Sequence, residues 1–334
     1  CKNYVAIKAL KSSENTRARF SSEFEALQAV TITKTQSPHV LQLRGAFNYA
    51  GKGNDGNHLC YATTLHGGNV ARLDAAGQLP LPLAKRIMLH CLRGIAHMHK
   101  HGYIHTDIKF DNILFSCNMS DEEITSLLIS DPSRRHDPED SPDGIVQAAV
   151  SQPFPLPSFD EAMERTFLLG DFSHAQPLSE RPPGPIAIPP HRPPENIILS
   201  PWNEKTDIWQ FGCLVYELIT GHWLFDWVPR PEYKRTPEAD LLSQMITVTG
   251  ERFSDTELTK GQKTGDYFDS DGNLLSRPSN VEDNCSLKLK KLGHLSDADA
   301  ASAYQLILRC LRLNPADRAN AVDLLQDPFF IEVD

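Results

Sequence analysis

The sequence predicts an α+β fold of two lobes, in which a small β-rich lobe is followed by a large, mainly helical lobe. Strand-like runs lie near the start of the chain, at residues 40–47 and 58–62, on either side of a Gly/Asn-rich turn. Long helical patterns come later, at 83–101 and 206–220. With 334 residues, the chain is long enough to build two such lobes.

The two lobes are expected to meet near residue 66. Residues 1–66 are assigned to the small lobe and the hinge, and residues 67–334 to the large lobe. An insert at about 116–166 interrupts the large lobe. Two capping boxes predict short helices within it, at Ser120 with Glu123 and at Ser158 with Glu161. The charged stretch between them, residues 131–144, is rich in Pro, Ser and Asp and predicts an exposed loop.

The two long helices have different apolar patterns. The helix at 83–101 has one apolar face, and Gly102 is expected to end it. That face contains Ile87, Cys91, Ile95 and Met98. The helix at 206–220 is apolar on all sides, which is typical of a buried central helix. Asp207, in its first turn, is expected to hold the backbone of the loop that follows the first helix.

The run from His105 to Asn112, His-Thr-Asp-Ile-Lys-Phe-Asp-Asn, contains three groups that phosphoryl transfer from ATP requires. The carboxylate of Asp107 is suited to orient an attacking hydroxyl and accept its proton. The ammonium of Lys109 is suited to neutralise charge on the moving phosphoryl group. The amide of Asn112 offers an oxygen ligand to Mg²⁺. The run therefore predicts Asp107 and Lys109 as catalytic groups, with ATP and Mg²⁺ as cofactors.

Further motifs flank this run in the order that such a site needs. Val-Ala-Ile-Lys at the start of the chain ends in Lys8, which is predicted to hold the α- and β-phosphates. Glu23 is predicted as the partner of Lys8, because it shares a helical face with Leu27 and Val30. Glu25 is the alternative partner.

Two motifs downstream complete the set. Gly-Asp-Phe-Ser places Asp171 after a strand-like run, where its carboxylate is expected to bind Mg²⁺. Pro-Pro-Glu ends at Glu195, which we expect to pair with Arg318 and so to brace the segment between the two motifs. Upstream, Thr63 and Leu65 fall in the hinge, where backbone groups are expected to bond the adenine of ATP and Thr63 to limit the back of its pocket.

Composition restricts the remaining possibilities. The charge of −10 disfavours nucleic acid as a ligand and is compatible with a basic protein partner. The sequence has neither an apolar run of membrane-spanning length nor a secretory signal. Seven widely spaced cysteines are typical of an intracellular protein without disulfides, cytoplasmic and/or nuclear. Four histidines lie close together at 97, 99, 101 and 105, but their spacing spreads them around a helix and does not favour a metal site.

Taken together, the motifs resemble a protein kinase of the SR-protein kinase family, which belongs to the CMGC group. The stretch His-Thr-Asp-Ile-Lys from His105 to Lys109 is identical to the catalytic loop of that family. The resemblance covers the whole chain and implies a protein kinase-like two-lobe fold and a serine/threonine protein kinase. It further implies Arg/Ser-rich substrates such as splicing factors, held by an acidic groove. We expect a monomer, with Glu232, Glu238 and Asp240 as weak candidates for the groove.

The chain departs from the family pattern at several positions. It begins at Cys1, so the glycine-rich loop and the first strands of the small lobe are expected to be missing from a truncated sequence. Ser173 replaces the glycine after Asp-Phe, which is expected to restrict the turn there. His191 stands where the family has a tyrosine, next to the site for the residue after the target serine. These departures leave a pseudokinase or binding scaffold as one alternative, and a kinase with other substrates as a second.

Overall fold

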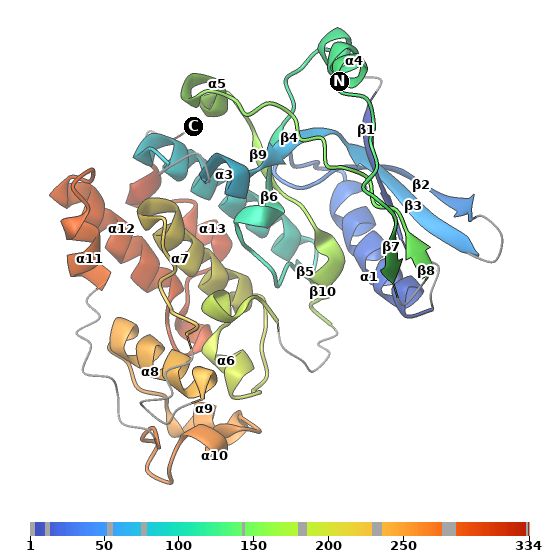
Figure 1. Ribbon diagram of the computed structural model, residues 1–334. Helices are drawn as coiled ribbons and strands as arrows, with labels where there is room; N and C mark the ends of the chain where they lie inside the picture. Colours follow the sequence, from blue (N-terminus) through green and yellow to red (C-terminus); the bar gives the residue numbers. More distant parts are fainter. Residues whose placement is uncertain are drawn as a thin grey trace.

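A computed structural model describes residues 4–10, 14–51, 56–74, 79–141, 144–179, 186–228, 236–275, 285–331 and 333. Figure 1 shows two lobes, with strands and one long helix at the amino-terminal side and a larger, mainly helical body. The predicted α+β two-lobe fold is therefore confirmed. Within the described ranges, no helix is both long and apolar enough to cross a membrane.

The small lobe contains a three-stranded antiparallel sheet and one helix. Its strands are β1 (Val5–Ala9), β2 (Leu43–Ala50) and β3 (Asn57–Thr64), in the order β1-β3-β2. The helix is α1 (Glu14–Thr31). The strands predicted at 40–47 and 58–62 are present, but β2 begins three residues later, because Val40 and Leu41 pair with Leu169 instead of with β3. In the β1–β3 pair, Lys8 lies opposite Tyr61.

A second small sheet joins the lobes. It consists of β4 (His66–Asn69), β6 (Ile113–Ser116) and β9 (Phe167–Leu169), in the order β4-β6-β9. Helix α2 (Val70–Asp74) follows β4 directly. The functional motifs therefore lie at the ends of paired strands: the run 105–112 comes just before β6, and Asp171 comes just after β9.

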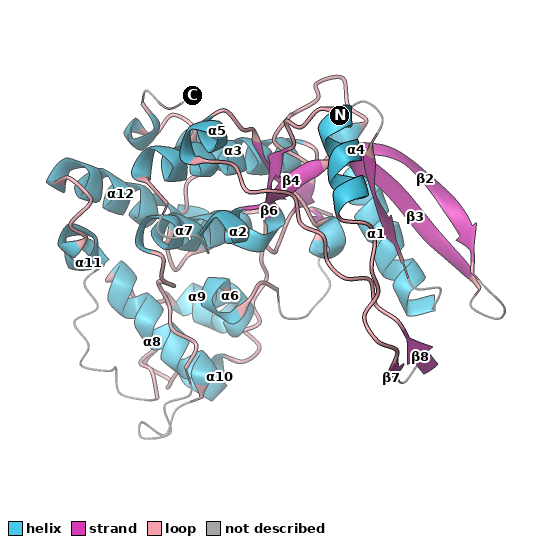
Figure 2. Ribbon diagram, turned by 45° about the horizontal axis from the view of Figure 1, so that its top comes forward, coloured by secondary structure: helices cyan, strands magenta, loops and turns pink. Residues whose placement is uncertain are grey.

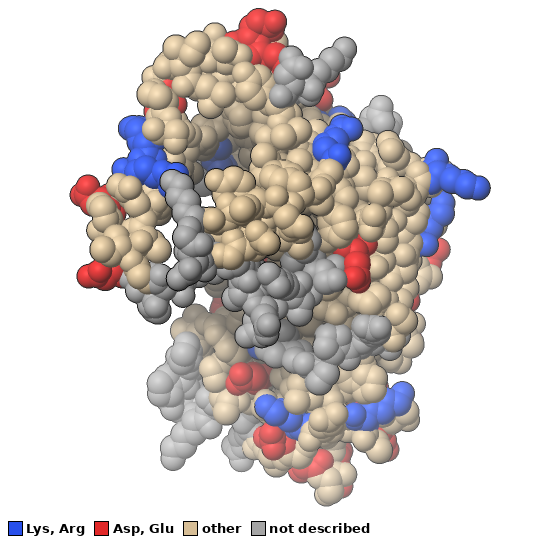
Figure 3. All heavy atoms as spheres, turned by 90° about the vertical axis from the view of Figure 1, so that its right-hand side faces the viewer, with Lys and Arg blue, Asp and Glu red and all other residues tan. Residues whose placement is uncertain are grey.

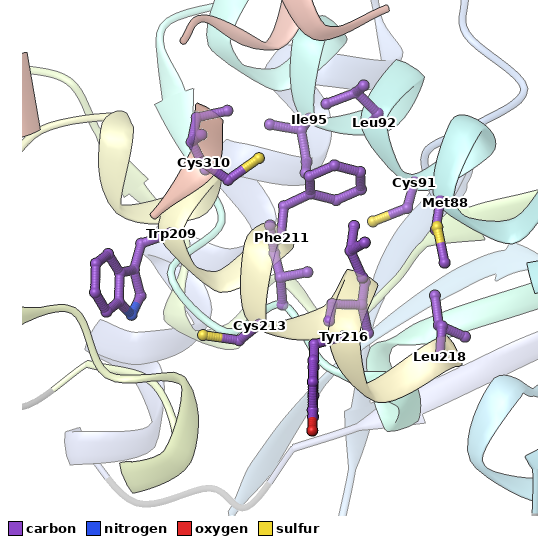
Figure 4. Close-up of a cluster of buried hydrophobic side chains, with 14 of the residues drawn as sticks. Met88, Cys91, Leu92, Ile95, Trp209, Phe211, Cys213, Tyr216, Leu218 and Cys310 are labelled. Atoms are coloured by element: carbon purple, nitrogen blue, oxygen red, sulfur yellow. The ribbon is translucent and has the colours of Figure 1, made fainter. Parts of the chain in front are cut away.

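Three helices form the centre of the large lobe: α3 (Leu81–Lys100), α7 (Lys205–Thr220) and α12 (Asp297–Cys310). Nearly every residue of α7 is buried, as the all-round apolar pattern predicted. Figure 4 shows side chains of the three helices in one cluster, including Cys91, Phe211 and Cys310. Left-handed glycines end two predicted helices, with φ of 80° at Gly102 and 71° at Gly221.

The remaining elements are short and surround this centre. They are β5 (Tyr103–Ile104), β10 (Gln176–Pro177), α6 (Pro194–Ile197), α8 (Pro237–Thr249), α9 (Asp255–Lys260), α10 (Thr264–Tyr267), α11 (Cys285–Lys291) and α13 (Ala321–Leu324). On the face seen in Figure 3, acidic and basic side chains are interspersed among uncharged ones. The net negative charge therefore does not form one continuous patch on that face.

The insert contains α4 (Asp121–Ser130), β7 (Glu139–Ser141), β8 (Gly144–Val146) and α5 (Phe159–Met163). Both predicted capping boxes are confirmed, at Ser120 and Ser158. The exposed loop predicted at 131–144 is wrong in part, because β7 and β8 form an antiparallel hairpin there. Part of the insert lies against the small lobe. Helix α4 lies beside the start of β1 (Figures 1 and 2), where the Tyr4 hydroxyl is 2.7 Å from Thr125 Oγ1.

Candidate active site

The loop between β5 and β6 brings Asp107, Lys109 and Asn112 into contact. Lys109 Nζ lies 2.7 Å from Asp107 Oδ2, and Asn112 Nδ2 donates to the same oxygen at 2.9 Å. Asn112 Nδ2 also donates to the Asp107 carbonyl at 2.8 Å. Because its amide nitrogen points at Asp107, the amide oxygen of Asn112 points elsewhere. The three residues that the sequence singled out therefore form one cluster around a single carboxylate.

Helix α7 holds the backbone of this loop. The Asp207 carboxylate accepts hydrogen bonds from the backbone N–H groups of His105 and Thr106, at 2.9 and 2.8 Å. This confirms the prediction for Asp207. Gln210, which the sequence reading missed, accepts from the Ile108 N–H at 2.7 Å and donates to the Thr106 carbonyl at 3.0 Å. One turn of α7 thus fixes four consecutive peptide groups of the loop, from the bond before His105 to the bond before Ile108.

These contacts support a strained backbone at Thr106. Its φ is 68°, in the left-handed region that β-branched residues rarely adopt. Such a conformation costs roughly 1–3 kcal/mol and persists only where surrounding contacts impose it. Here the Thr106 hydroxyl also donates to the His174 carbonyl at 2.7 Å. The loop is therefore shaped by its surroundings and not by local preference.

The four clustered histidines each have a separate partner. His97 bonds the Val30 carbonyl, His99 the Asp207 carboxylate at 2.8 Å, and His101 the carbonyl of His97. His105 Nε2 donates to the Gly170 carbonyl at 3.0 Å, while its Nδ1 accepts from the Asp107 N–H. Histidine 99 is thus part of the frame around Asp207, a role that its helical spacing alone did not indicate.

Lys8 and Glu23 form the predicted pair across the small lobe. Lys8 Nζ lies 2.8 and 3.0 Å from the two carboxylate oxygens of Glu23, which selects Glu23 over Glu25. Tyr61, missed from the sequence, donates its hydroxyl to the same carboxylate. Burial raises the pKa of Tyr61, and the neighbouring Glu23 charge raises it further, so this hydroxyl stays protonated and able to donate.

Asp171 connects the two lobes at the site. Its Oδ1 lies 3.5 Å from Lys8 Nζ and accepts from the Ser173 N–H at 3.4 Å. Burial raises the pKa of Asp171, but the hydrogen bonds from Ser173 and the charge of Lys8 outweigh burial and lower it overall. In this turn Asp171 has the positive φ, 55°, and Ser173 does not. The substitution of glycine by serine is therefore accommodated in the present conformation.

The other predicted positions are found at the edges of the site. Thr63 is buried near the end of strand β3, and Leu65 is half-buried between β3 and β4. Arg318 forms the predicted bidentate pair with Glu195, with both N···O distances at 2.7 Å and both side chains buried. This pair ties the segment after Asp171 to the loop that precedes α13.

The structure supports only part of the prediction for the acidic groove. The prediction that Asp240 lines the groove is wrong. Asp240 is buried in the first turn of α8 and accepts a hydrogen bond from Gln244 Nε2 at 3.0 Å. Glu238 is half-buried, and its charge acts on Arg192. Glu232 lies outside the described residues. Among the described residues, Glu238 remains a candidate for contact with a basic peptide, and Glu232 stays an untested prediction.

Comparison with known proteins agrees with this geometry. The protein kinase domain family matches residues 1–132 and 159–330. The unmatched gap lies inside the insert and includes the hairpin of β7 and β8.

Similar curated proteins are kinases by name. The chain is 27% identical to the serine/threonine-protein kinase SRPK of Physarum polycephalum, over 98% of this chain and 80% of that protein. It is 26% identical to the serine/threonine-protein kinase AFC1 of Arabidopsis thaliana, over 98% of this chain and 66% of that protein. It is 25% identical to the dual specificity protein kinase lkh1 of Schizosaccharomyces pombe, where it spans 43% of the relative's length.

Proposed function

Since the chain belongs to the protein kinase family and is a protein serine/threonine kinase, we propose that it transfers the γ-phosphoryl group of ATP to serines in Arg/Ser-rich proteins. The observation that carries the chemistry is the cluster of Asp107, Lys109 and Asn112, with Lys109 Nζ and Asn112 Nδ2 both within 2.9 Å of one oxygen of Asp107. Such preorganised charge is the main means by which proteins accelerate phosphoryl transfer.

Each residue of the cluster has a distinct role in this proposal. Asp107 orients the serine hydroxyl of the substrate and accepts its proton as the oxygen attacks. Lys109, held on Asp107, stabilises negative charge on the transferred group. Lys8 binds the α- and β-phosphates, and Glu23 keeps its ammonium directed at them. The Tyr61 hydroxyl donates to the same carboxylate and helps to hold Glu23, on helix α1, toward Lys8 on strand β1.

The donor set suits Mg²⁺. Asp171 presents a carboxylate that is partly exposed, and its pKa is lowered, so it is ionised at neutral pH. Asn112 turns its amide oxygen away from Asp107, as a second hard ligand. When bound, Mg²⁺ neutralises phosphate charge and orients the transferred group. We propose Asn112 and Asp171 as its protein ligands.

For the nucleotide base, we propose the hinge at Thr63–Leu65. Thr63 limits the depth of the adenine pocket, and backbone groups near Leu65 bond its edge. The Thr64 N–H already donates to the Gln42 carbonyl at 3.0 Å, so this end of β3 is held in place. We also propose a division into lobes near residue 66, with the insert at about 116–166.

The substrate class rests on three supports of different kinds. The relative from Physarum carries the name SRPK, the loop from His105 to Lys109 is identical to that family's, and the charge of −10 favours a basic partner. Glu238 is the described acidic residue that we propose to contact such a partner. We further propose a monomer, cytoplasmic and/or nuclear.

The test is transfer of ³²P from Mg-ATP by the full-length protein to an Arg-Ser repeat peptide and to a generic basic peptide. The Asp107→Asn variant is the matched control, because it keeps the size of the side chain and removes the base. We expect transfer to the Arg-Ser peptide that is lost in the variant.

Other results separate the alternatives. Transfer to the generic peptide alone would retain the kinase and reject the Arg/Ser substrate class. Transfer to neither peptide above the Asp107→Asn background would favour a pseudokinase or scaffold, the reading that Ser173 in place of glycine suggested.

A further inference from the structure

His191 is a buried histidine between the loop 105–112 and helix α7. It ends a short 3₁₀ turn, Pro189–His191, and only 1% of its surface is exposed. Its Nδ1 lies 3.0 Å from the carbonyl oxygen of Ile108, and its Nε2 lies 3.1 Å from Glu217 Oε2 on α7. Ile108 is the residue between Asp107 and Lys109. A single imidazole ring therefore joins α7 to the centre of the catalytic cluster.

The chemistry of the two partners fixes the hydrogen on Nδ1. A backbone carbonyl can only accept, so Nδ1 carries a hydrogen and donates it to Ile108. Nε2 faces a carboxylate oxygen, and an unprotonated nitrogen would repel it. One proton is therefore held between Nε2 and Glu217. The ring is therefore held by one hydrogen bond on each side, to the Ile108 carbonyl and to the Glu217 carboxylate.

The Ile108 peptide groups are held on both sides. The N–H of Ile108 donates to Gln210 Oε1 at 2.7 Å, and its carbonyl accepts from His191 at 3.0 Å. That carbonyl belongs to the peptide bond that leads into Lys109. Because this peptide is planar, fixing its oxygen fixes the direction in which the Lys109 backbone leaves it.

Resting on the proposed kinase function, we propose that His191, supported by Glu217, is a positioning residue that fixes the Ile108–Lys109 peptide and so directs the Lys109 ammonium to Asp107. The residue does not touch substrate or nucleotide in this role. It acts through the backbone of the catalytic loop, from a segment about eighty residues away in sequence.

Several charged groups surround the His191–Glu217 pair. Burial raises the pKa of Asp74 at the end of α2, and the charge of Glu217 raises it further. Glu217 also lines a cavity of about 680 Å³. The other titratable residues of that cavity are Tyr216, His222, Asp226, Lys288 and Lys291. On the catalytic side, the charged residues nearest in sequence are Asp107 and Lys109, which precede and follow Ile108.

Two substitutions separate this role from that of a histidine that only fills space. Asparagine places an amide nitrogen where Nδ1 lies and can keep the bond to Ile108. Glutamine places its amide where Nε2 lies, and can keep the contact with Glu217 while leaving the Ile108 carbonyl without its donor. Glutamine is closer to histidine in volume than asparagine is, so a space-filling role predicts the larger loss in His191→Asn, the opposite of what a positioning role predicts.

The experiment measures kcat and KM for ATP, after comparison of the wild type with Asp107→Asn has established the activity. We expect kcat to fall about threefold in His191→Asn and at least about thirtyfold in His191→Gln, with KM for ATP within about twofold, since small misplacements of reacting groups can cost about a hundredfold. Equal kcat values in the two variants would overturn the positioning role. An inactive wild type would instead contradict the proposed function.

A second measurement does not depend on activity. In protein labelled with ¹⁵N-histidine, NMR of the ring nitrogens reports which one carries hydrogen, and the His191→Asn variant assigns the signal by its disappearance. We expect hydrogen on Nδ1 of His191 and a shift of the Nε2 signal in Glu217→Gln. An unprotonated Nδ1 would exclude the bond to Ile108 and with it the proposal.

Discussion

The two sides of the active site differ in how firmly they are supported. On the large-lobe side, Arg318 and Glu195 have side chains only 0% and 2% exposed, and Asp207 is fully buried beneath the catalytic loop. On the small-lobe side, the side chain of Lys8 is 42% exposed. Its strand β1 also exposes apolar residues, with Val5 at 47% and Ile7 at 57%.

This difference indicates where stability and activity are separable. Groups on the buried side are needed to fold the loop, so their loss should lower stability and activity together. The Lys8 ammonium is instead oriented by both oxygens of Glu23, one of which also accepts from the Tyr61 hydroxyl. Loss of Lys8 should therefore lower activity with little change in stability. The four predictions below test that comparison.

The largest stability effect is expected for Arg318→Ala. The change leaves the Glu195 carboxylate buried without its bidentate partner, and breaking a buried ion pair in this way costs about 3–5 kcal/mol of unfolding free energy. Urea unfolding followed by circular dichroism measures the loss. In the double variant Arg318→Met with Glu195→Leu, much of it should return because no buried charge remains. A loss below about 1 kcal/mol in the single variant would show that the pair is not a main support.

The second prediction concerns Lys8→Met, which keeps the side-chain length and removes the charge. Phosphoryl transfer should fall by about a hundredfold or more, as for removal of other groups that stabilise transition-state charge. Unfolding free energy should change by less than about 1 kcal/mol, because a partly exposed ion pair contributes little. Lys100→Met, at the exposed end of α3, is the matched control and should keep full activity. A stability loss as large as that of Arg318→Ala would remove the distinction between the two sides.

The third prediction is acid sensitivity at the junction of the lobes, where the rings of His39 and His90 lie 4.4 Å apart. Burial lowers the pKa of His90 from 6.5 to about 3, and it lowers the pKa of His39 as well. Both are therefore neutral when folded and take up protons on unfolding. Their contribution to stability is complete above pH 6.5 and is lost as pH falls below that value.

Urea unfolding at several pH values between about 7.5 and 5 measures this effect, with an expected slope of about 1.4 kcal/mol per pH unit for each histidine. In His90→Asn, the amide oxygen can still accept from the Phe167 N–H, and the slope of unfolding free energy against pH should fall by the contribution of one histidine. The exposed His136→Gln should leave the slope unchanged. An unchanged slope in His90→Asn would mean that other groups cause the acid sensitivity.

The fourth prediction is a small loss of stability in Tyr61→Phe. The substitution removes one hydrogen bond to Glu23 and leaves the bonds from Lys8, so about 1 kcal/mol of unfolding free energy should be lost. Thermal unfolding measured with and without Mg-ATP provides the comparison. If the loss disappears in Lys8→Met with Tyr61→Phe, the two donors act on Glu23 as one unit.

The sequence was most informative where a residue's role follows from its position in a motif. Asp107, Lys109 and Asn112 lie within six residues, so one loop conformation brings them together. Glu23 could be chosen over Glu25 because helical spacing decides which carboxylate faces β1. The central helix α7 was predictable because its apolar pattern has no polar face.

Other features depend on packing between distant segments. Tyr61 and Gln210 lie in apolar stretches, and nothing local distinguishes them from core residues until the partner element is in place. The burial of Asp240 also depends on a distant segment. An acidic residue near a helix start is usually exposed, so the sequence alone predicted exposure. The hairpin of β7 and β8 was missed because Glu139–Ser141 is polar and lacks the alternating pattern of a half-buried strand.

The insert enters and leaves the large lobe at one point. The Ser116 N–H donates to the Thr166 carbonyl at 2.9 Å, and the Thr166 N–H donates to Ser116 Oγ at 3.1 Å. These bonds continue the β6–β9 pairing, so the two ends stay together whatever lies between them. Doubling the length of a closed loop adds only about 0.6 kcal/mol of closure entropy. The segment between Ser116 and Thr166 can therefore lengthen, shorten or be exchanged for a foreign domain during evolution or engineering, while strands β6 and β9, next to Asn112 and Asp171, keep their register.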